Sequence, residues 1–183
     1  MDTPDVFEQT VVGGAVPKNF FPAVEKGIAE SVKKGPLAAY PVTGIKAVLY
    51  DGSYHPVDSS EMAFKVATQQ AFKKGIMEAK PVLLEPVATL KVVVPEVYTG
   101  DVMGELNKRR ARVMGMNPTD NGYQEIVADI PYLELYGYNA TLPSMTSGSG
   151  TFSYEFARHE QAPDDVAAKQ IEERASKLVE VEE

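Results

Sequence analysis

Side chains suited to acid–base, nucleophilic or metal chemistry are scarce in this chain. It has no cysteine and two histidines, His55 and His159, so a thiol nucleophile and a cysteine-ligated metal site are excluded. Neither histidine has a metal-binding spacing, and His159 is interpreted as an ordinary surface residue. No G-x-x-x-x-G-K-[ST] phosphate loop occurs, and the glycines of segment 148–150 have the wrong spacing for a nucleophile elbow. The sequence therefore predicts a binding module with no catalytic residue, metal or cofactor of its own.

The histidine with the more informative setting is His55. It follows Ser53 and Tyr54 in segment 51–61, between an expected strand and an expected helix. A loop in that place projects beyond the end of a sheet. One interpretation is an ordinary exposed loop residue, and the other is a contact residue at the end of the projecting loop.

One dense basic cluster is present. It consists of Lys108, Arg109, Arg110 and Arg112 at the end of an expected helix. Its plain interpretation is a solvated helix C-terminus, and its functional interpretation is contact with the phosphates of a large RNA. The formal net charge of the chain is −8, so a nucleic-acid role depends on such a local patch and not on general attraction.

Composition places the chain among globular proteins. Its 183 residues are 44% hydrophobic and 24% charged, which is near the globular average. No apolar run is long enough for a membrane span, and the acidic N-terminal segment lacks the apolar stretch of a secretory signal. We therefore expect a cytoplasmic protein.

The first 85 residues predict a β-α-β-α-β unit. Strands are expected over 6–12, 42–50 and 82–84, with helices from about 17 to 34 and from 59 to 79. Asp58 and Glu61 have the spacing of a capping box for the second helix. The buried face of that helix is expected to be rich in small residues, so that it lies close to a sheet: Phe64, Ala67, Ala71, Phe72, Gly75, Ile76 and Ala79.

Residues 86–160 predict a second unit with the order β-α-β-β-α-β, which is the ferredoxin-like arrangement. Pro86 is expected to separate the units because it cannot donate a strand hydrogen bond. Residues 117–122 (NPTDNG) are expected to form a hairpin loop, and Pro131 is expected to open a short helix. A final helix over 164–178 with an acidic tail completes residues 161–183. The fold class is thus α+β, with two small tandem units.

Several long motifs resemble the C-terminal part of bacterial translation elongation factor G, that is, its fourth and fifth domains. The segments that carry the resemblance are 11–18 (VVGGAVPK), 23–28 (AVEKGI), 49–65 (LYDGSYHPVDSSEMAFK), 79–86 (AKPVLLEP) and 100–110 (GDVMGELNKRR). Residues 142–144 and 147–150 depart from the main factor and are more similar to elongation factor G-like paralogues.

The resemblance implies a fold and a role. The first unit is expected to have a fold similar to the second domain of ribosomal protein S5, lacking its N-terminal part, with an unusual left-handed crossover. In the family, a multidomain GTPase drives tRNA–mRNA translocation, and the tip of domain four enters the decoding centre of the small ribosomal subunit. GTP and Mg²⁺ would bind in a nucleotide-binding domain that this chain does not contain.

The resemblance also places the site residues. The family's tip histidine falls on His55, flanked by Ser53 and Tyr54, and the basic cluster would face large-subunit rRNA. Expected partners are the ribosome with its tRNA and mRNA, and the region is expected to be monomeric, away from membranes and not itself an enzyme. The alternative is an interaction or regulatory module that works without translocase activity.

Overall fold

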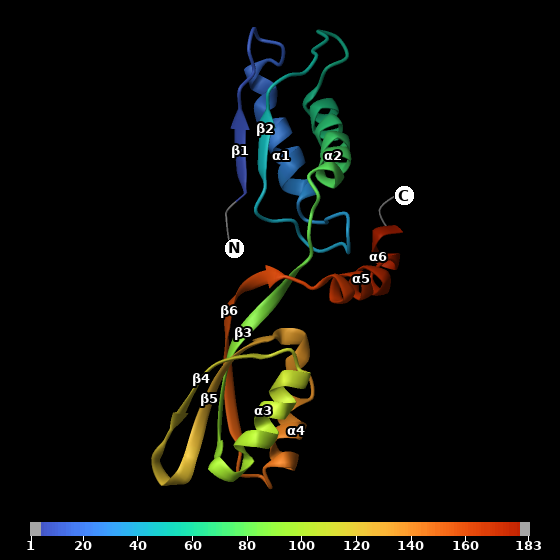
Figure 1. Ribbon diagram of the computed structural model, residues 1–183. Coiled ribbons are helices and arrows are strands. Elements are labelled where there is room, and N and C mark those ends of the chain that lie inside the picture. Colours follow the sequence, from blue (N-terminus) through green and yellow to red (C-terminus); the bar gives the residue numbers. More distant parts are fainter. Residues whose placement is uncertain (1–4, 180–183) are drawn as a thin grey trace. The chain divides into compact units, whose positions relative to one another are not determined.

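The computed structural model describes residues 5–179, which form two separate compact units (Figure 1). The second unit comprises Leu84–Gln161, and the first comprises the described residues before and after it. The C-terminal helical segment is therefore part of the first unit and not a separate tail. The last residues of the expected acidic tail, 180–183, lie outside the described residues.

The first unit is built on two short parallel strands. β1 (Val6–Gln9) pairs with β2 (Lys46–Leu49). The connection between them contains the short 3-10 helix η1 (Lys18–Phe20) and then helix α1 (Phe21–Ser31). Helix α2 (Glu61–Glu78) follows β2. The strand expected over 82–84 does not form in this unit, because Leu84 already begins the first strand of the second unit.

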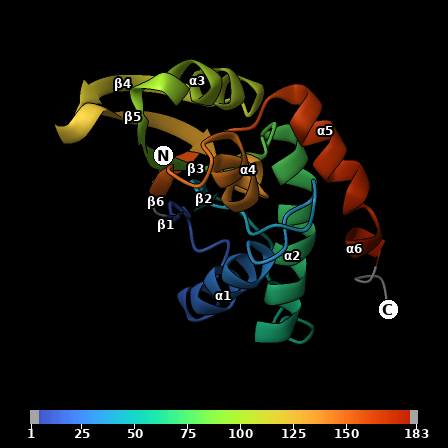
Figure 2. The ribbon, with the colours of Figure 1, turned by 90° about the horizontal axis from the view of Figure 1, so that it is seen from below.

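Helix α2 packs on α1, and the two lie side by side in both views (Figures 1 and 2). Its inward face carries the buried Ile76 and the half-buried Phe64 and Phe72, whereas Ala67 and Ala71 are exposed. The expected small-residue face is thus wrong in part. Because the helix meets another helix and not a wide sheet, bulky side chains fill the space between them.

The start of α2 differs from the expected capping box. Ser60 is the N-cap residue, and its Oγ accepts a hydrogen bond from the backbone N–H of Ala63 at 3.0 Å. Ser60 and Ala63 have the usual N-cap and N3 spacing. Asp58 is not the cap, because it belongs to the preceding turn, where it faces His55.

Gly27 is the point of close approach between the two helices. A Cβ atom placed on it lies 2.9 Å from Cβ of Thr68 and 3.0 Å from the backbone oxygen of Lys65. We expect Gly27→Ala to destabilise the first unit by about 1–2 kcal/mol, because separating the helices outweighs the higher helix propensity of alanine. The measurement is urea unfolding followed by signals from the first unit.

Gly75 provides the matched control for this prediction. It lies on the exposed side of α2, and nothing lies within 4 Å of an added Cβ. Gly75→Ala is expected to stabilise the unit by about 0.5–1 kcal/mol through helix propensity alone. Equal effects of the two substitutions would contradict the close-packing interpretation of Gly27.

The C-terminal segment packs against the first unit. It forms α5 (Asp164–Glu173) and α6 (Ser176–Val179), so the single helix expected over 164–178 is interrupted. Nε of Arg174 donates to the backbone oxygen of Ala38 at 2.7 Å, and its guanidinium lies 3.8 Å from the ring centroid of Tyr40. These contacts fix the segment on the loop that follows α1.

The second unit is a four-stranded antiparallel sheet of order β4-β5-β3-β6. This order with its helices is the ferredoxin-like fold that the sequence predicts. The strands are β3 (Leu84–Pro95), β4 (Arg112–Pro118), β5 (Tyr123–Pro131) and β6 (Thr151–Gln161). The helices are α3 (Thr99–Lys108) and α4 (Tyr138–Met145), with 3-10 turns η2 (Glu96–Tyr98), η3 (Asp120–Gly122) and η4 (Tyr132–Leu135).

Helices α3 and α4 lie to one side of this sheet (Figure 1) and bury its core. The core residues are fully buried apolar side chains of β3, α3, β5 and α4: Ala88, Leu90, Val92, Val94, Val102, Leu106, Ile126, Ala128, Ile130, Tyr138 and Leu142. The opposite side, which we call the open face, is not covered by these helices.

Two local expectations for the second unit need correction. Pro86 does not break a strand, since β3 runs through it. At that position β3 pairs only with β6, because its pairing with β5 starts at Val87, so no second neighbour requires an N–H from proline. The short helix expected from Pro131 is the 3-10 turn η4. The main second helix, α4, starts after Gly137, whose φ of 75° is left-handed.

Candidate nucleic-acid interface

The parallel pairing of β1 and β2 brings two loops to one end of the first unit (Figure 1). The loop over 10–17 follows β1, and the loop over 50–60 follows β2. The N-termini of α1 and α2 lie at the same end, because each helix follows its strand through one of these loops. We call this end the tip. Ser53, Tyr54 and His55 all belong to its second loop.

The turn around His55 is closed by its own hydrogen bonds. The backbone N–H of His55 donates to Oγ of Ser59 at 2.9 Å, and the N–H of Ser59 donates to the His55 carbonyl at 3.0 Å. The imidazole Nδ1 lies 3.1 Å from Oδ2 of Asp58 and 3.4 Å from the N–H of Val57. Nδ1 donates to Asp58 when protonated and accepts from Val57 when not. The ring is therefore braced on its Nδ1 side, while 65% of the side chain remains exposed.

The tip loop is also anchored to the interior. The ring of Tyr54 lies 5.7 Å from that of Phe20, which is buried and stacks on Phe64 at 4.5 Å. A Cβ on Gly52 would lie 2.5 Å from a methyl of the buried Val16, so the two tip loops are in direct contact. These contacts limit the movement of the short loop that presents His55.

Three exposed apolar side chains also belong to the tip and were not predicted. Val12 and Val57 are each 84% exposed and Tyr50 is 74% exposed. Large apolar groups at loop positions are typical of contact surfaces. Their exposure could have been inferred from the sequence, because all three lie in or next to expected turns, where an apolar side chain is not part of a strand or helix that packs on the core.

Arg109 of the basic cluster is used within the second unit. Its Nε donates to Oε1 of Glu105 at 2.7 Å. One terminal nitrogen donates to the carbonyls of Glu134 (2.6 Å) and Tyr136 (3.0 Å), and the other donates to Oγ1 of Thr141 at 3.0 Å. The side chain thus connects the end of α3 to η4 and α4, and few donors remain for RNA.

The buried ring of Tyr138 lies under the same guanidinium, 5.2 Å from centroid to Cζ of Arg109. Burial raises the pKa of the Tyr138 phenol to about 12. The hydroxyl therefore stays neutral beneath the charged arginine, and this contact serves packing.

Arg110 is likewise paired. Its two terminal nitrogens contact both carboxylate oxygens of Glu85 at 3.0 and 2.9 Å, and its Nε contacts Glu134 at 2.9 Å. The hydrogen bonds that Arg110 donates to Glu85 outweigh burial and raise the pKa of Arg110 further above its already high value. Because Arg110 binds Glu85 on one side and Glu134 on the other, it connects the start of β3 to η4.

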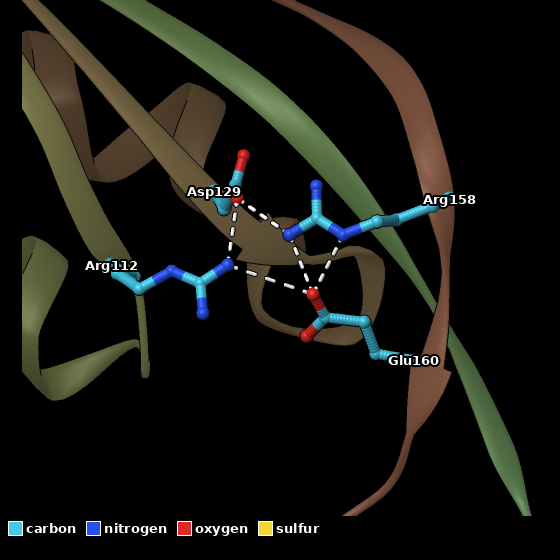
Figure 3. Close-up of polar contacts among 4 residues, drawn as sticks. All are labelled: Arg112, Asp129, Arg158 and Glu160. Carbon is cyan, nitrogen blue, oxygen red and sulfur yellow. Dashed lines mark hydrogen bonds and ion pairs between the residues drawn. The ribbon is translucent and has the colours of Figure 1, made fainter. Parts of the chain in front are cut away.

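Arg112 begins β4 and points onto the open face of the sheet. Its Nη2 donates to Oδ2 of Asp129 at 3.0 Å and lies 3.6 Å from Oε1 of Glu160 (Figure 3). Arg158 contacts the same two oxygens, at 2.6 Å for Asp129 and 2.7 Å from its Nε to Glu160. Burial tends to raise the pKa of Asp129, but Arg158 and Arg112 outweigh it and hold that pKa below its ordinary value.

The basic cluster is therefore divided by the structure. Lys108 is exposed at the end of α3, and Arg112 retains a side chain that is 62% exposed. Arg109 and Arg110 are mostly engaged in contacts with their own unit. Within residues 5–179, no group of three potential metal ligands is assembled, and no helix is long and apolar enough to cross a membrane. His159 belongs to β6 of the second unit, and its ring lies 5.2 Å from that of Phe156.

Comparison with known proteins identifies the class to which this fold belongs. Residues 2–80 match the family model for elongation factor G, domain IV, and residues 82–170 match the model for the elongation factor G C-terminus. The chain belongs to the elongation factor G family and corresponds to its domains IV and V.

Two relatives illustrate the extent of the match. An elongation factor G-like protein of Thermotoga maritima is 48% identical over 176 residues, which is 96% of this chain and 26% of that protein. A crystal structure of a Thermus thermophilus protein superposes with a TM-score of 0.83 at 42% identity, covering 95% of this chain and 26% of the other. The chain thus spans about a quarter of the length of each.

Proposed function

We propose that this region is the ribosome-contacting part of an elongation factor G-type translation factor. The tip of the first unit enters the decoding centre of the small subunit and contacts the tRNA–mRNA pair during translocation. The second unit contacts large-subunit rRNA through its basic residues. The observation that carries the proposal is the tip itself: His55 is exposed at the end of a loop that is braced by Ser59 and anchored through Tyr54.

The chemistry of the tip suits RNA contact without strong charge attraction. The imidazole edge, the Ser53 and Tyr54 side chains and the exposed Val57 offer hydrogen bonds and apolar surface to unpaired bases. An acidic chain can use such contacts because they do not depend on counterion release. In the second unit, Lys108 and Arg112 are the cluster members that present charge, while Arg109 and Arg110 position the surface around them.

The region has no catalytic role in this proposal. GTP hydrolysis belongs to a nucleotide-binding domain elsewhere in proteins of this class, and the two units transmit its effect mechanically. We propose that the region acts in the cytoplasm, as a monomer, and binds no cofactor.

The test is binding of the 183-residue protein to ribosomes carrying mRNA and tRNA, with chemical protection of small-subunit RNA as the readout. Wild-type protein is expected to protect decoding-centre nucleotides and to compete with tRNA for that site. His55→Ala is expected to weaken this protection about fivefold, the worth of roughly one hydrogen bond. The chain offers Gln70→Ala, on the exposed side of α2, as a control that leaves the tip intact.

Two results would count against the proposal. The first is protein that binds ribosomes but protects no small-subunit RNA, which would favour an interaction module without a translocase role. The second is His55→Ala with the same protection as Gln70→Ala.

A further inference from the structure

Four charged side chains form a closed ring on the open face of the second unit (Figure 3). Arg112 comes from β4, Asp129 from β5, and Arg158 and Glu160 from β6. Each arginine contacts both carboxylates, and each contact uses the same oxygen, Oδ2 of Asp129 or Oε1 of Glu160. The ring holds two guanidinium groups side by side on this face of the sheet.

The two carboxylates of the ring are not equivalent. The Asp129 side chain is 10% exposed and sits on an inner strand of the sheet, so it cannot leave the arginines. The Glu160 side chain is 41% exposed, on the edge strand. An exposed ion pair contributes little net free energy, because water can replace either partner. Glu160 is therefore the replaceable member of the ring and Asp129 is the fixed one.

We propose that Arg112 and Arg158 bind a backbone phosphate of RNA, and that Glu160 occupies the position of this phosphate in the free protein. The inference rests on the proposed function, since it names the RNA group that the second unit contacts. Asp129 holds the two guanidinium groups in place, and a phosphate offers them more acceptor oxygens than the single Oε1 of Glu160. Arg112 uses one nitrogen in the ring, so its remaining donors can face the ligand.

The surroundings of the ring favour phosphate contact over contact with bases. The aromatic residues of β6 pair with Ala88, Leu90 and Val92, whose side chains face the helices: Phe156, Tyr154 and Phe152. The aromatic side chains of β6 thus lie on the side of the sheet opposite the open face. Thr89 and Glu155 follow Asp129 across the register of the open face, so the residues in register with Asp129 are polar and not aromatic. Without stacking groups the four-residue ring contacts the backbone, and binding is independent of base sequence.

The experiment titrates the 183-residue protein with purified large ribosomal subunits over a series of salt concentrations. Arg112→Gln is expected to weaken binding about tenfold and to lower the dependence of log K on log salt by about one. The fold survives this change because Asp129 keeps Arg158 as its partner, and an unchanged melting temperature verifies it. Arg112→Lys, which keeps the charge but not the fork, is expected to restore only part of the affinity.

Removing the replaceable carboxylate gives the opposite effect. Glu160→Gln is expected to tighten binding about three- to tenfold, because the phosphate no longer displaces a charged group. Glu155→Gln removes the same charge from the same strand outside the ring, and Lys74→Gln is the matched control for Arg112→Gln in the first unit. Both controls are expected to change affinity by less than about twofold.

The outcomes separate this inference from the function on which it rests. If wild-type protein binds the subunits but Arg112→Gln matches Lys74→Gln, or Glu160→Gln matches Glu155→Gln, the phosphate site is refuted and ribosome binding stands. If wild-type protein binds no ribosomal particle, both are refuted. Inorganic phosphate is the second arm: saturation of the Arg112 and Arg158 side-chain NMR signals by phosphate alone, with unchanged subunit binding in Arg112→Gln, would assign a small-anion site and overturn the RNA assignment.

Discussion

Replacing Arg109 with alanine is expected to destabilise the second unit by about 2–4 kcal/mol, because the side chain satisfies several groups at once. Its guanidinium neutralises Glu105, whose side chain is only 18% exposed, and bonds the carbonyls of Glu134 and Tyr136. It also donates to Thr141 at the start of α4. Alanine would leave these acceptors in a partly buried place without donors. The end of α3 would lose its connection to η4 and α4.

The measurement is urea unfolding of the second unit, with Lys108→Ala as the adjacent control. Lys108 is exposed at the same helix end, so its truncation is expected to change the free energy of unfolding by less than about 0.5 kcal/mol. Comparison of the two variants shows whether Arg109 stabilises its own unit or contacts RNA. If Arg109→Ala lowered ribosome affinity without any loss of stability, its guanidinium would contact RNA and the positioning role would be wrong.

The fold of the second unit could be predicted from its sequence because each of its elements is locally specified. Alternation of apolar residues defines the strands, and the turn residues of segment 117–122 predict a hairpin loop, although β4 continues through Asn117 and Pro118. In the structure the loop consists of Asp120–Gly122 and is closed by the hydrogen bond from the N–H of Thr119 to the carbonyl of Tyr123 at 2.8 Å, with positive φ at Asn121 (64°) and Gly122 (75°). With a β-α-β-β-α-β order, few sheet topologies remain possible. The observed order β4-β5-β3-β6 is the ferredoxin-like one.

The environment of the basic cluster could not be predicted in the same way. Its partners lie 24 or 25 residues away for Arg110 (Glu134, Glu85) and 17 away for Arg112 (Asp129). Such pairings arise from strand register and from the β-bulge near Val87, which sets the place of Arg158. Charge density along the sequence identifies the residues but not their partners. The structure is therefore needed to show that Arg109 and Arg110 are engaged within the unit, whereas Lys108 and Arg112 stay accessible.

The first unit shows a second limit of sequence reasoning. The helix over 59–79 has apolar residues on more than one side, and periodicity alone does not decide which side is buried. The buried side of α2 is set by its contact with α1. The two helices approach closely at Gly27, and the side of α2 that carries Phe64, Phe72 and Ile76 is the one that packs inward. The attachment of α5 to the same unit likewise depends on Arg174, whose partners Ala38 and Tyr40 lie far earlier in the chain.

The tip was located from sequence by its place between a strand and a helix, and its exposure agrees with that expectation. What the sequence did not show is how the loop is held. The hydrogen bonds between His55 and Ser59 and the contact of Gly52 with Val16 join residues of the tip to one another. The ring of Tyr54 joins the loop to Phe20. The position of the tip loop therefore depends on a side chain from the interior of the unit.

Replacing Phe20 with alanine is expected to destabilise the first unit by about 3–5 kcal/mol. Phe20 is 8% exposed and stacks on Phe64, so the substitution leaves a cavity between η1 and α2. The buried apolar residues of this unit are few and mostly small: Val16, Phe20, Ala23, Val24, Ala38, Ile76 and Ala162. A core of this size gives the unit a small free energy of unfolding, so the loss of one large side chain has a large effect. The tip loop would lose the ring on which Tyr54 rests.

The second unit is expected to be unaffected by Phe20→Ala, because all the residues of its core cluster belong to that unit. Urea unfolding followed by NMR signals of Val24 and of Val92 tests this, with the Val24 midpoint falling and the Val92 midpoint unchanged. Phe20→Leu keeps most of the apolar volume and is expected to cost about 1 kcal/mol. A parallel fall of both midpoints would mean that the units unfold together. Separate transitions would mean that the first unit, with its tip, can unfold while the second unit stays folded.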